Sequence, residues 1–250
     1  MSEDKSWFES DEFWEVSEPV LFPPERIEAA PDEVAQILNL TTTTPKSAVL
    51  DLCCGVGRHS VALAGAGMNV TAVDLTDRHL ARTEAAARDK GLAIEIVKSD
   101  MRQFCRPEAY DLIVNLFTSF GYFEREEDDR LVATNMFRSL RSGGKAVIDI
   151  ISKERLAKIF LPNNWSELDD GTLLLEERRA TQDWGWMENR WIFIKGTQRH
   201  DLRFGHRLYS AVELKKLMLA AGFSSVQAFG SLEGAPFDHE SKRLIIVACK

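Results

Sequence analysis

The chain has 250 residues, of which 44% are hydrophobic and 28% charged, a composition that excludes a disordered or fibrous protein and allows a full hydrophobic core. Its net charge of −8, without a Lys- or Arg-rich run, disfavours a phosphate backbone as partner, so no nucleic acid is expected to bind. The polar start of the chain and the lack of an apolar run near the about 18 residues that a membrane span needs predict a cytoplasmic protein that does not cross a membrane.

Four cysteines include the adjacent pair Cys53 and Cys54, while Cys105 and Cys249 stand far from them in the sequence. No spacing typical of metal ligands occurs. We therefore expect reduced thiols and no metal site.

The first 45 residues show no strand pattern. Aromatic residues stand among acids there, followed by Ile27, Val34, Ile37 and Leu38 at helical spacing, which predicts a helical N-terminal cap. After the cap, short apolar runs alternate with helix-length segments, which is typical of a parallel α/β sheet. Strands are predicted at 48–52, 69–74, 93–98, 110–116 and 145–151. Helices are predicted at 58–66, 77–90 and 126–141, the last closed by Gly143 and Gly144.

From residue 152 the pattern changes to consecutive strands. Extended segments at 171–181 and 186–195 flank Asp183-Trp-Gly185, a hairpin signal, and 197–209 is a third extended segment. Residues 152–205 are therefore predicted to form an antiparallel insertion. A helix at 211–221 and strands at 225–230 and 243–249 complete a core of residues 46–151 and 206–250, so we expect a single domain.

A glycine turn joins the first strand of this pattern to the following helix. In Ala48-Val-Leu-Asp-Leu-Cys-Cys-Gly-Val-Gly-Arg58, Gly55 and Gly57 let a ligand approach the backbone beside the free N–H groups of a helix start. Asp74 ends the next strand, where an acid can accept hydrogen bonds from ribose hydroxyls. Together these residues predict a nucleotide pocket.

Two kinds of cofactor suit such a pocket. A nicotinamide dinucleotide fold has the pattern Gly-x-Gly-x-x-Gly, but Ser60 stands at the place of the third glycine. Asp51 lies inside the first strand, where such a fold has an apolar residue, and a buried carboxylate there needs partners. Both departures make an NAD-type Rossmann oxidoreductase the less favoured alternative.

The chain resembles the class I S-adenosylmethionine-dependent methyltransferases, and within them the type 11/25-like small-molecule subgroup. Four motifs in family order carry the resemblance: Val49-Leu-Asp-Leu-Cys-Cys-Gly-Val-Gly-Arg58, Val73-Asp74, Lys98-Ser-Asp-Met-Arg102 and Tyr110-Asp-Leu-Ile-Val-Asn-Leu-Phe-Thr-Ser-Phe-Gly-Tyr122. It continues through 140–150 and 206–223. The resemblance implies an α/β fold with a doubly wound, seven-stranded, mostly parallel Rossmann-like sheet whose last strand is antiparallel. The helical cap and an inserted antiparallel β hairpin or sheet are additions to that fold.

By position, the resemblance implies the residues that bind S-adenosyl-L-methionine and its product S-adenosyl-L-homocysteine. Asp51, Gly55 and Gly57 surround the methionine part in this comparison, and Asp74 holds the ribose hydroxyls. Asp100 and Met101 meet the adenine. The expected cofactor site is completed by Leu75 and Asn115.

The acceptor side is expected at the carboxyl edge of the sheet, where ligands of open α/β sheets bind. Candidate catalytic residues are Asn115, Tyr122 and His206, and candidate substrate contacts are Tyr122, Arg207, Tyr209 and Trp14. Asn115 stands where several amino-methylating family members have an acid or an Asn-Pro-Pro segment, and no Asn-Pro-Pro-Tyr occurs, which leaves the acceptor atom open. Tryptophans gather in the insertion and the cap, which favours a lid over a small apolar or aromatic substrate: Trp165, Trp184, Trp186 and Trp191, with Trp7 and Trp14.

The sequence therefore predicts a methyltransferase that passes the methyl group of S-adenosylmethionine to nitrogen or oxygen of a small molecule by in-line displacement. Alternatives left open are an RNA or protein methyltransferase and a regulator that binds the cofactor without catalysis. The protein is expected to be a monomer or a homodimer.

Overall fold

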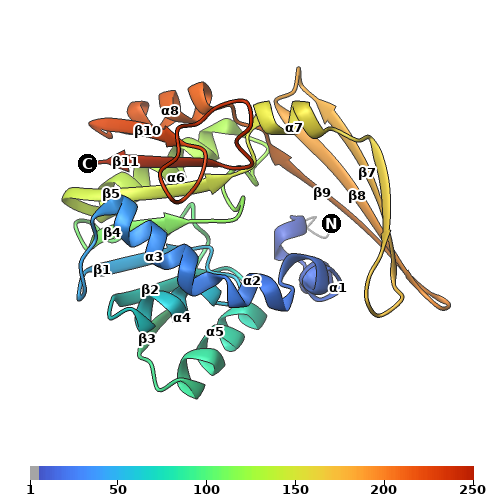
Figure 1. Cartoon of the computed structure of the whole chain (residues 1–250), viewed down its shortest axis with the longest axis horizontal. Coiled ribbons are helices and arrows are strands. Elements are labelled where there is room, and N and C mark those ends of the chain that lie inside the picture. The colour runs from blue at the N-terminus through green and yellow to red at the C-terminus, as the bar shows by residue number, and fades with distance from the viewer. Residues whose placement is uncertain (1–5) are drawn as a thin grey trace, which may run out of the picture.

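A seven-stranded sheet with helices on its faces forms the larger side of the molecule in the computed structural model, which describes residues 6–250 (Figure 1). Its strand order is β10-β11-β5-β4-β1-β2-β3. The strands are β1 (Ala48–Leu52), β2 (Asn69–Asp74), β3 (Ile94–Lys98), β4 (Tyr110–Asn115), β5 (Leu140–Ile150), β10 (Ser225–Phe229) and β11 (Leu244–Cys249). Within this sheet of the described residues, β11, the last strand of the chain, pairs antiparallel with both of its neighbours, and the strands from β5 to β3 pair parallel. The predicted fold class is thereby confirmed.

Helices cover both faces of this sheet because its central strands are apolar on both faces, as strands of parallel sheets are. Alternate residues of β1 point to opposite faces, and Leu50 lies in one core cluster while Val49 lies in another. The first cluster includes residues of α6 (Glu126–Ser139) and α8 (Ala211–Ala220). The second includes residues of α3 (Ala30–Thr41) and α4 (Arg58–Gly65), and α5 (Asp77–Asp89) packs beside α4.

One predicted boundary is wrong. The helix expected at 126–141 ends at Ser139, and β5 begins at Leu140, whose backbone is already extended (φ −75°, ψ 145°). Gly143 and Gly144 therefore lie within a strand and do not cap a helix. A Cβ on Gly144 would lie 2.9 Å from the carbonyl oxygen of Arg141, so this bend of the strand requires glycine.

A second, four-stranded antiparallel sheet follows the order β6-β7-β8-β9. Its strands are β6 (Asn163–Glu167), β7 (Leu173–Thr181), β8 (Trp186–Lys195) and β9 (Gln198–Arg207). β7, β8 and β9 confirm the expected insertion. β6 and the short helix α7 (Lys153–Ile159) were not expected, because the edge strand Asn-Asn-Trp-Ser-Glu has neither an apolar run nor alternation and is mostly exposed.

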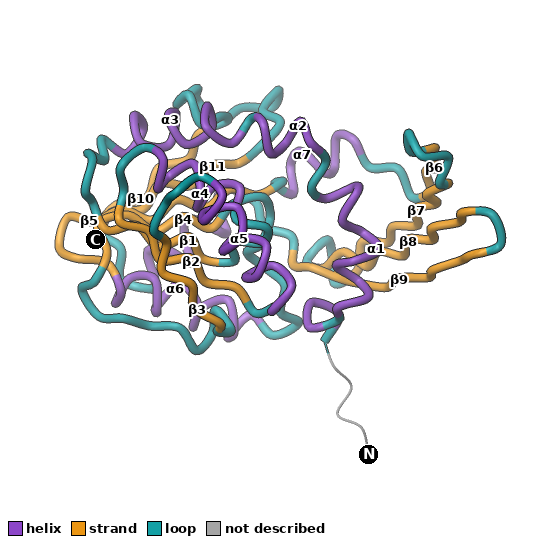
Figure 2. Tube along the Cα trace, turned by 90° about the horizontal axis from the view of Figure 1, so that it is seen from below, coloured by secondary structure: helices purple, strands orange, loops and turns teal. Residues whose placement is uncertain are grey.

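The N-terminal helices lie between the two sheets (Figures 1 and 2). They are the 3-10 helix η1 (Trp7–Glu9), α1 (Asp11–Leu21) and α2 (Pro24–Glu28). Phe13 of α1 is buried in a cluster with Leu174, Phe193 and Leu202 of the four-stranded sheet. Phe8 of η1 instead belongs to the core of the seven-stranded sheet. These helices therefore tie the four-stranded sheet to the carboxyl edge of the core.

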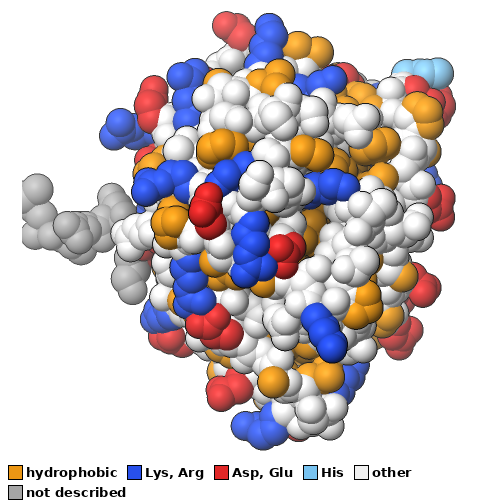
Figure 3. All heavy atoms as spheres, turned by 90° about the vertical axis from the view of Figure 1, so that its left-hand side faces the viewer, with side chains coloured by type: hydrophobic (Ala, Val, Ile, Leu, Met, Phe, Trp, Pro, Cys, Tyr) orange, Lys and Arg blue, Asp and Glu red, His pale blue; other side chains and the backbone are white. Residues whose placement is uncertain are grey.

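The surface carries charges of both signs. On the face shown in Figure 3, Lys and Arg side chains are interspersed with Asp and Glu, and neither sign forms a continuous patch there. Within residues 6–250, no helix combines the length and the apolar character needed to cross a bilayer.

Candidate active site

A cavity of about 650 Å³ lies where the carboxyl edge of the seven-stranded sheet meets the N-terminal helices and the four-stranded sheet. The loops after β1, β2, β3 and β4 supply one side of it. The other side comes from η1, α1, β8 and β9. Of the predicted site residues, those that line the cavity are Trp14, Asp51, Gly55, Asp74, Leu75, Asp100, Met101, Tyr122 and His206. Those that do not are Gly57, Asn115, Arg207 and Tyr209.

The glycine turn is shaped by steric necessity. Gly55 and Gly57 both have positive φ (55° and 76°), and Gly57 is the N-cap of α4. A Cβ on Gly57 would lie 2.5 Å from Thr83 Cγ2, so no larger residue fits. Cys53 also has a positive φ of 64°, which is unfavourable for a residue with a side chain. The turn therefore holds its backbone open toward the cavity at some conformational cost.

Asp51 is buried at the end of β1, where Ser60 Oγ donates a hydrogen bond of 2.6 Å to its Oδ2. Burial raises the pKa of Asp51, although the charges of His59 and Arg58 and the bond from Ser60 oppose that rise. Ser60, which replaces the third glycine of a dinucleotide fingerprint, thus acts as a partner for the buried carboxylate.

The Asp74 carboxylate lies against the glycine turn and accepts backbone N–H groups. Its Oδ2 accepts the Gly55 N–H at 2.9 Å, and its Oδ1 accepts the Thr76 N–H at 3.0 Å. His79 Nδ1 lies 3.3 Å from the same Oδ1. Burial by itself would raise the pKa of Asp74, but the hydrogen bonds and charge of His79 and the backbone N–H donors lower it. The carboxylate is therefore ionised and held against the turn. His79 had no partner that sequence reasoning identified.

Asp100 and Met101 follow β3 at the same edge. Both oxygens of Asp100 interact with Arg102, with Nη2–Oδ2 at 2.6 Å. Met101 is buried, and its Sδ lies 3.4 Å from Cys53 Sγ. Leu75, directly after Asp74, packs against the same core cluster as Met101. The residues assigned to ribose and adenine therefore surround one end of the cavity.

Asn115 lies behind this end and is fully buried. Its Nδ2 donates to the Leu52 carbonyl at 3.0 Å, which ties the end of β4 to the end of β1. Its Oδ1 is buried without a hydrogen-bond partner among the described residues. The structure thus gives Asn115 a bracing position rather than a place in the cavity wall.

Arg207 and Tyr209 also point away from the cavity. The Tyr209 hydroxyl donates to Asp129 Oδ2 at 2.7 Å, and Arg207 Nε lies 3.4 Å from the same oxygen. Arg207 also donates to the Glu124 carbonyl. Burial raises the pKa of Asp129 to about 7, partly opposed by Tyr209 and Arg207. The contacts of Asp129 with Arg207 and Tyr209 therefore connect α6 to the end of β9 and the residues that follow it.

Rings from η1, the loop after β4, β8 and β9 pack on one another in the part of the cavity that we call the aromatic half, whereas Phe22 lies against Gly55 at the glycine turn. Trp7 packs on Tyr122, with ring centroids 4.6 Å apart, and on Phe204 at 5.5 Å. Trp191 meets Phe204 at 4.9 Å from the other side. Trp14 faces His79 at 4.9 Å and so lies where the aromatic half meets the glycine-turn half. Burial raises the pKa of Tyr122, so its hydroxyl is neutral.

His206 on β9 is the histidine of the aromatic half. Burial lowers its pKa to about 4, so the imidazole is neutral at neutral pH. The Asn189 side-chain amide lies 3.5 Å from His206 Nδ1. The amide atom at this distance is Nδ2, which can donate to Nδ1; turning the amide by 180° would instead present its oxygen to Nδ1–H and leave Nε2 with a free lone pair. The imidazole is therefore unprotonated beside the apolar cavity and can accept a proton from a bound molecule, although its low pKa makes it a weak base.

Three arginines that sequence reasoning missed surround the Phe117 ring. The guanidinium carbons of Arg26, Arg58 and Arg243 lie 4.3, 5.2 and 5.3 Å from its centroid. Glu33 pairs with Arg58 at 2.5 Å, and Asp149 pairs with Arg243 at 2.6 Å. The three arginines come from α2, from α4 and from the residue before β11, so no local spacing in the sequence could have grouped them.

Arg26 differs from the other two arginines. Its Nη1 donates to the carbonyls of Val20 and Leu21, and no carboxylate among residues 6–250 forms an ion pair with it. Burial, and then the charges of Arg58 and Arg243, lower its pKa. The cavity wall therefore carries one guanidinium whose charge a bound anion would balance.

Comparison with known proteins agrees with this geometry. Residues 49–144 match the methyltransferase domain family. The methyltransferase homologue GWCH70_2453 of Geobacillus sp. (strain WCH70) is 24% identical over 207 residues, which are 81% of this chain and 84% of that one. A S-adenosylmethionine-dependent methyltransferase structure from Clostridium acetobutylicum has a TM-score of 0.77 at 19% identity and covers 96% of this chain and 98% of its own.

A further similar structure is S-adenosylmethionine-bound CalS10, an amino pentose methyltransferase from Micromonospora echinaspora. It has a TM-score of 0.63 at 19% identity, with 98% of this chain and 92% of the other covered. The sheet order, the glycine turn and the domain match define a nucleotide-binding α/β enzyme fold of the methyltransferase type. Residues 49–144 thus match the methyltransferase domain family, and the fold is the class I Rossmann-like fold of S-adenosylmethionine-dependent methyltransferases.

Proposed function

We propose that this protein transfers the methyl group of S-adenosylmethionine to a nitrogen or oxygen atom of a small molecule. The observation that carries the proposal is a single cavity with two unlike halves. One half is polar and formed by the glycine turn, Asp74 and Asp100, and the other is aromatic and contains His206. A donor and an acceptor held in these halves would meet inside one cavity, which is the arrangement an in-line displacement needs.

The chemistry of the polar half suits the proposed cofactor. The ionised Asp74 is placed to accept hydrogen bonds from ribose hydroxyls, and Asp100 with Met101 would border the adenine. The unpaired Arg26 guanidinium would hold the carboxylate of the methionine part, next to the turn at Gly55. Asp51 and Gly55 would adjoin the same part.

The residues of the chain would contribute alignment, exclusion of water and one proton acceptor. The sulfonium of the bound cofactor supplies an activated methyl group and a good leaving group. His206, neutral in the aromatic half, would accept the proton that an attacking hydroxyl or ammonium group must lose. Tyr122 and Trp14 would border the acceptor, and packing of Trp7 on Tyr122 would keep water out.

A small acceptor is favoured by the position of the aromatic half. The N-terminal helices and the four-stranded sheet border it on the side opposite the core. The similar CalS10 structure is that of an amino pentose methyltransferase, and its bound S-adenosylmethionine supports the same cofactor here. The net charge of −8 argues against an RNA substrate.

Calorimetric titration with S-adenosylmethionine, S-adenosylhomocysteine and NADH tests the cofactor. We expect both adenosyl compounds to bind and NADH not to bind. Incubation with methyl-labelled S-adenosylmethionine and panels of small amines, phenols, RNA and peptides then tests the acceptor. Label in a small molecule supports the proposal, whereas label only in RNA or peptide overturns the small-molecule assignment. Binding of NADH alone would overturn the whole proposal.

A further inference from the structure

The loop after β4 makes a strained turn at the wall of the cavity. Phe117 and Thr118 are consecutive residues with positive φ, 61° and 65°. Side chains with a Cβ rarely adopt this conformation, and a β-branched residue such as Thr118 is especially disfavoured in it. Such a turn persists only where neighbouring groups hold it.

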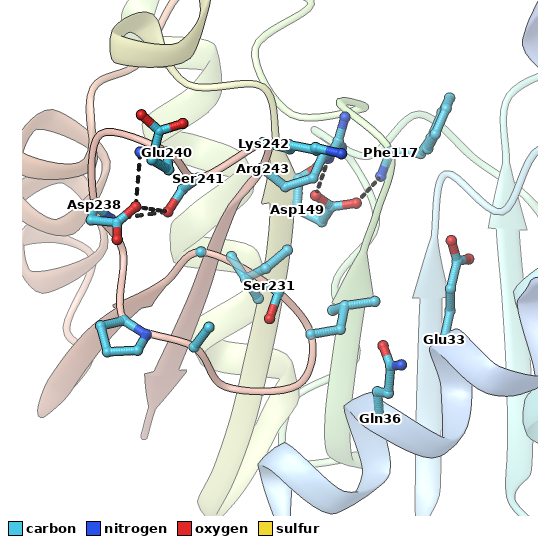
Figure 4. Close-up of a pocket in the computed structure, with 15 residues that line it drawn as sticks. Glu33, Gln36, Phe117, Asp149, Ser231, Asp238, Glu240, Ser241, Lys242 and Arg243 are labelled. Atoms are coloured by element: carbon cyan, nitrogen blue, oxygen red, sulfur yellow. Dashed lines mark hydrogen bonds and ion pairs between the residues drawn. The ribbon is translucent and has the colours of Figure 1, made fainter.

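Asp149, near the end of β5, holds this turn (Figure 4). Its Oδ2 accepts the Phe117 N–H at 3.2 Å, and its backbone carbonyl accepts the Thr118 N–H at 2.8 Å. Arg243 completes the arrangement, since its Nε donates to Asp149 Oδ1 at 2.6 Å and its Nη2 donates to Thr118 Oγ1 at 3.2 Å. One carboxylate and one guanidinium thus fix both strained residues.

The turn separates two cavities. Phe117 and Arg243 line the cavity of about 650 Å³ described above and also a second cavity of about 510 Å³ beside the β10–β11 loop. On the side of the first cavity, the Phe117 ring is the surface on which the Arg26 guanidinium lies, 4.3 Å from the centroid. The position of this ring, together with the Val20 and Leu21 carbonyls, therefore sets where the unpaired cation of the cavity is presented.

We infer that Asp149 and Arg243 are positioning residues for cofactor binding, which act through the Phe117–Thr118 turn on Arg26. The inference rests on the proposed binding of S-adenosylmethionine. Asp149 has no need to touch the cofactor in this role. Its carboxylate sets the Phe117 backbone, the Phe117 ring sets Arg26, and Arg26 meets the anionic end of the ligand.

Calorimetric titration with S-adenosylhomocysteine tests this chain of contacts. We expect Asp149→Asn to weaken binding at least tenfold in the wild-type background. In an Arg26→Gln background, the same change is expected to weaken binding less than threefold, because the group through which it acts is already lost. Equal losses in both backgrounds would mean a general structural role and would overturn the inference.

Two further variants keep the test decisive. Glu188→Gln removes the carboxylate of a surface Arg–Glu pair of similar length, Arg179–Glu188 at 2.7 Å, and is expected to leave binding unchanged. Arg243→Lys keeps the charge but loses the two-pronged contact with Asp149 and Thr118, and is expected to weaken binding at least threefold. If Asp149→Asn does not fold, the affinity of Arg243→Lys for S-adenosylhomocysteine tests the positioning role in its place.

The possible failures are distinguishable. A wild-type protein that binds no S-adenosylhomocysteine overturns the proposed function. A wild-type protein that binds it, with unchanged affinity in folded Asp149→Asn or in Arg243→Lys, overturns only the positioning role.

Discussion

The two halves of the cavity are built in different ways. The glycine-turn half is polar, and its residues lie at or just after the carboxyl ends of β1, β2 and β3, where Asp74 accepts backbone N–H groups. The aromatic half is formed by rings from η1, α1, β8 and β9, which are far apart in the chain. Local hydrogen bonding thus defines the first half, whereas packing between distant segments defines the second. Substitutions in the glycine-turn half should weaken cofactor binding. Substitutions in the aromatic half should lower the rate of methyl transfer and leave cofactor binding unchanged.

The largest effect is expected at the glycine turn. Gly57→Ala combines a positive φ of 76° with a collision against the Thr83 side chain, and we expect a loss of about 3 kcal/mol in the free energy of unfolding. Gly143→Ala is the matched control, because its φ of 78° is similar but no atom lies within 4 Å of the new Cβ. It should cost about 1 kcal/mol. Urea unfolding measures both, and equal losses would refute the steric account of the turn.

The next largest effect separates the two halves. His206→Gln should lower kcat for methyl transfer about 100-fold, since a general base is lost. Its affinity for S-adenosylhomocysteine should stay within twofold of wild type, because His206 belongs to the aromatic half. Steady-state assays with labelled S-adenosylmethionine and calorimetry provide the two readouts. A parallel fall in both quantities would remove the distinction between the halves.

A smaller effect is expected on the polar side. Asp74→Asn removes the carboxylate charge but keeps one acceptor oxygen, and S-adenosylhomocysteine binding should weaken more than tenfold, or about 1.4 kcal/mol. Asp77→Asn, at the start of α5 and exposed, is the control and should change the affinity less than twofold. Calorimetry of both variants checks this, and unchanged binding by Asp74→Asn would exclude that residue from the cofactor site.

The smallest effect concerns pH. The pKa of His206 is about 4 in the folded protein against 6.5 for an ordinary histidine, so the unfolded chain binds the extra proton between these values. The titration of His206 should therefore lower the free energy of unfolding as the pH falls from about 6.5 toward 4. His206→Gln should lose less stability than wild type between pH 7 and pH 5 in urea titrations. Equal losses would show that His206 is not held neutral by burial.

Sequence reasoning was most accurate where local rules decide the structure. β1 and β2 were predicted residue for residue, since apolar runs bounded by glycine and aspartate leave little choice. It failed at the end of α6, where a Gly-Gly pair resembles a helix stop but lies inside β5. The cap-and-insertion lid predicted from tryptophans remains a prediction, although the structure does bring Trp7, Trp14 and Trp191 to one cavity.

In the candidate site, too, sequence reasoning succeeded where local rules apply and failed where tertiary packing decides. Asp51, Gly55, Asp74 and Asp100 could be predicted because each stands at a fixed offset from a strand end. Arg207 and Tyr209 were proposed as substrate contacts from their place after the insertion, but the structure points them to Asp129, away from the cavity. Side-chain direction at a strand end depends on the pairing register and on what packs behind it, which sequence position does not contain.

By itself, the sequence determined most of the strands and helices in order, though not β6 or α7, together with the glycine turn and the acids at the ends of β1, β2 and β3, because backbone conformation and hydrogen bonding act over a few residues. Only the tertiary structure decided that Arg26, Arg58 and Arg243 surround Phe117, and that Trp7 and His206 share a cavity. Those residues come from separate elements. Their proximity results from burial of apolar surface between the two sheets and the N-terminal helices, a force without a local signature in the chain.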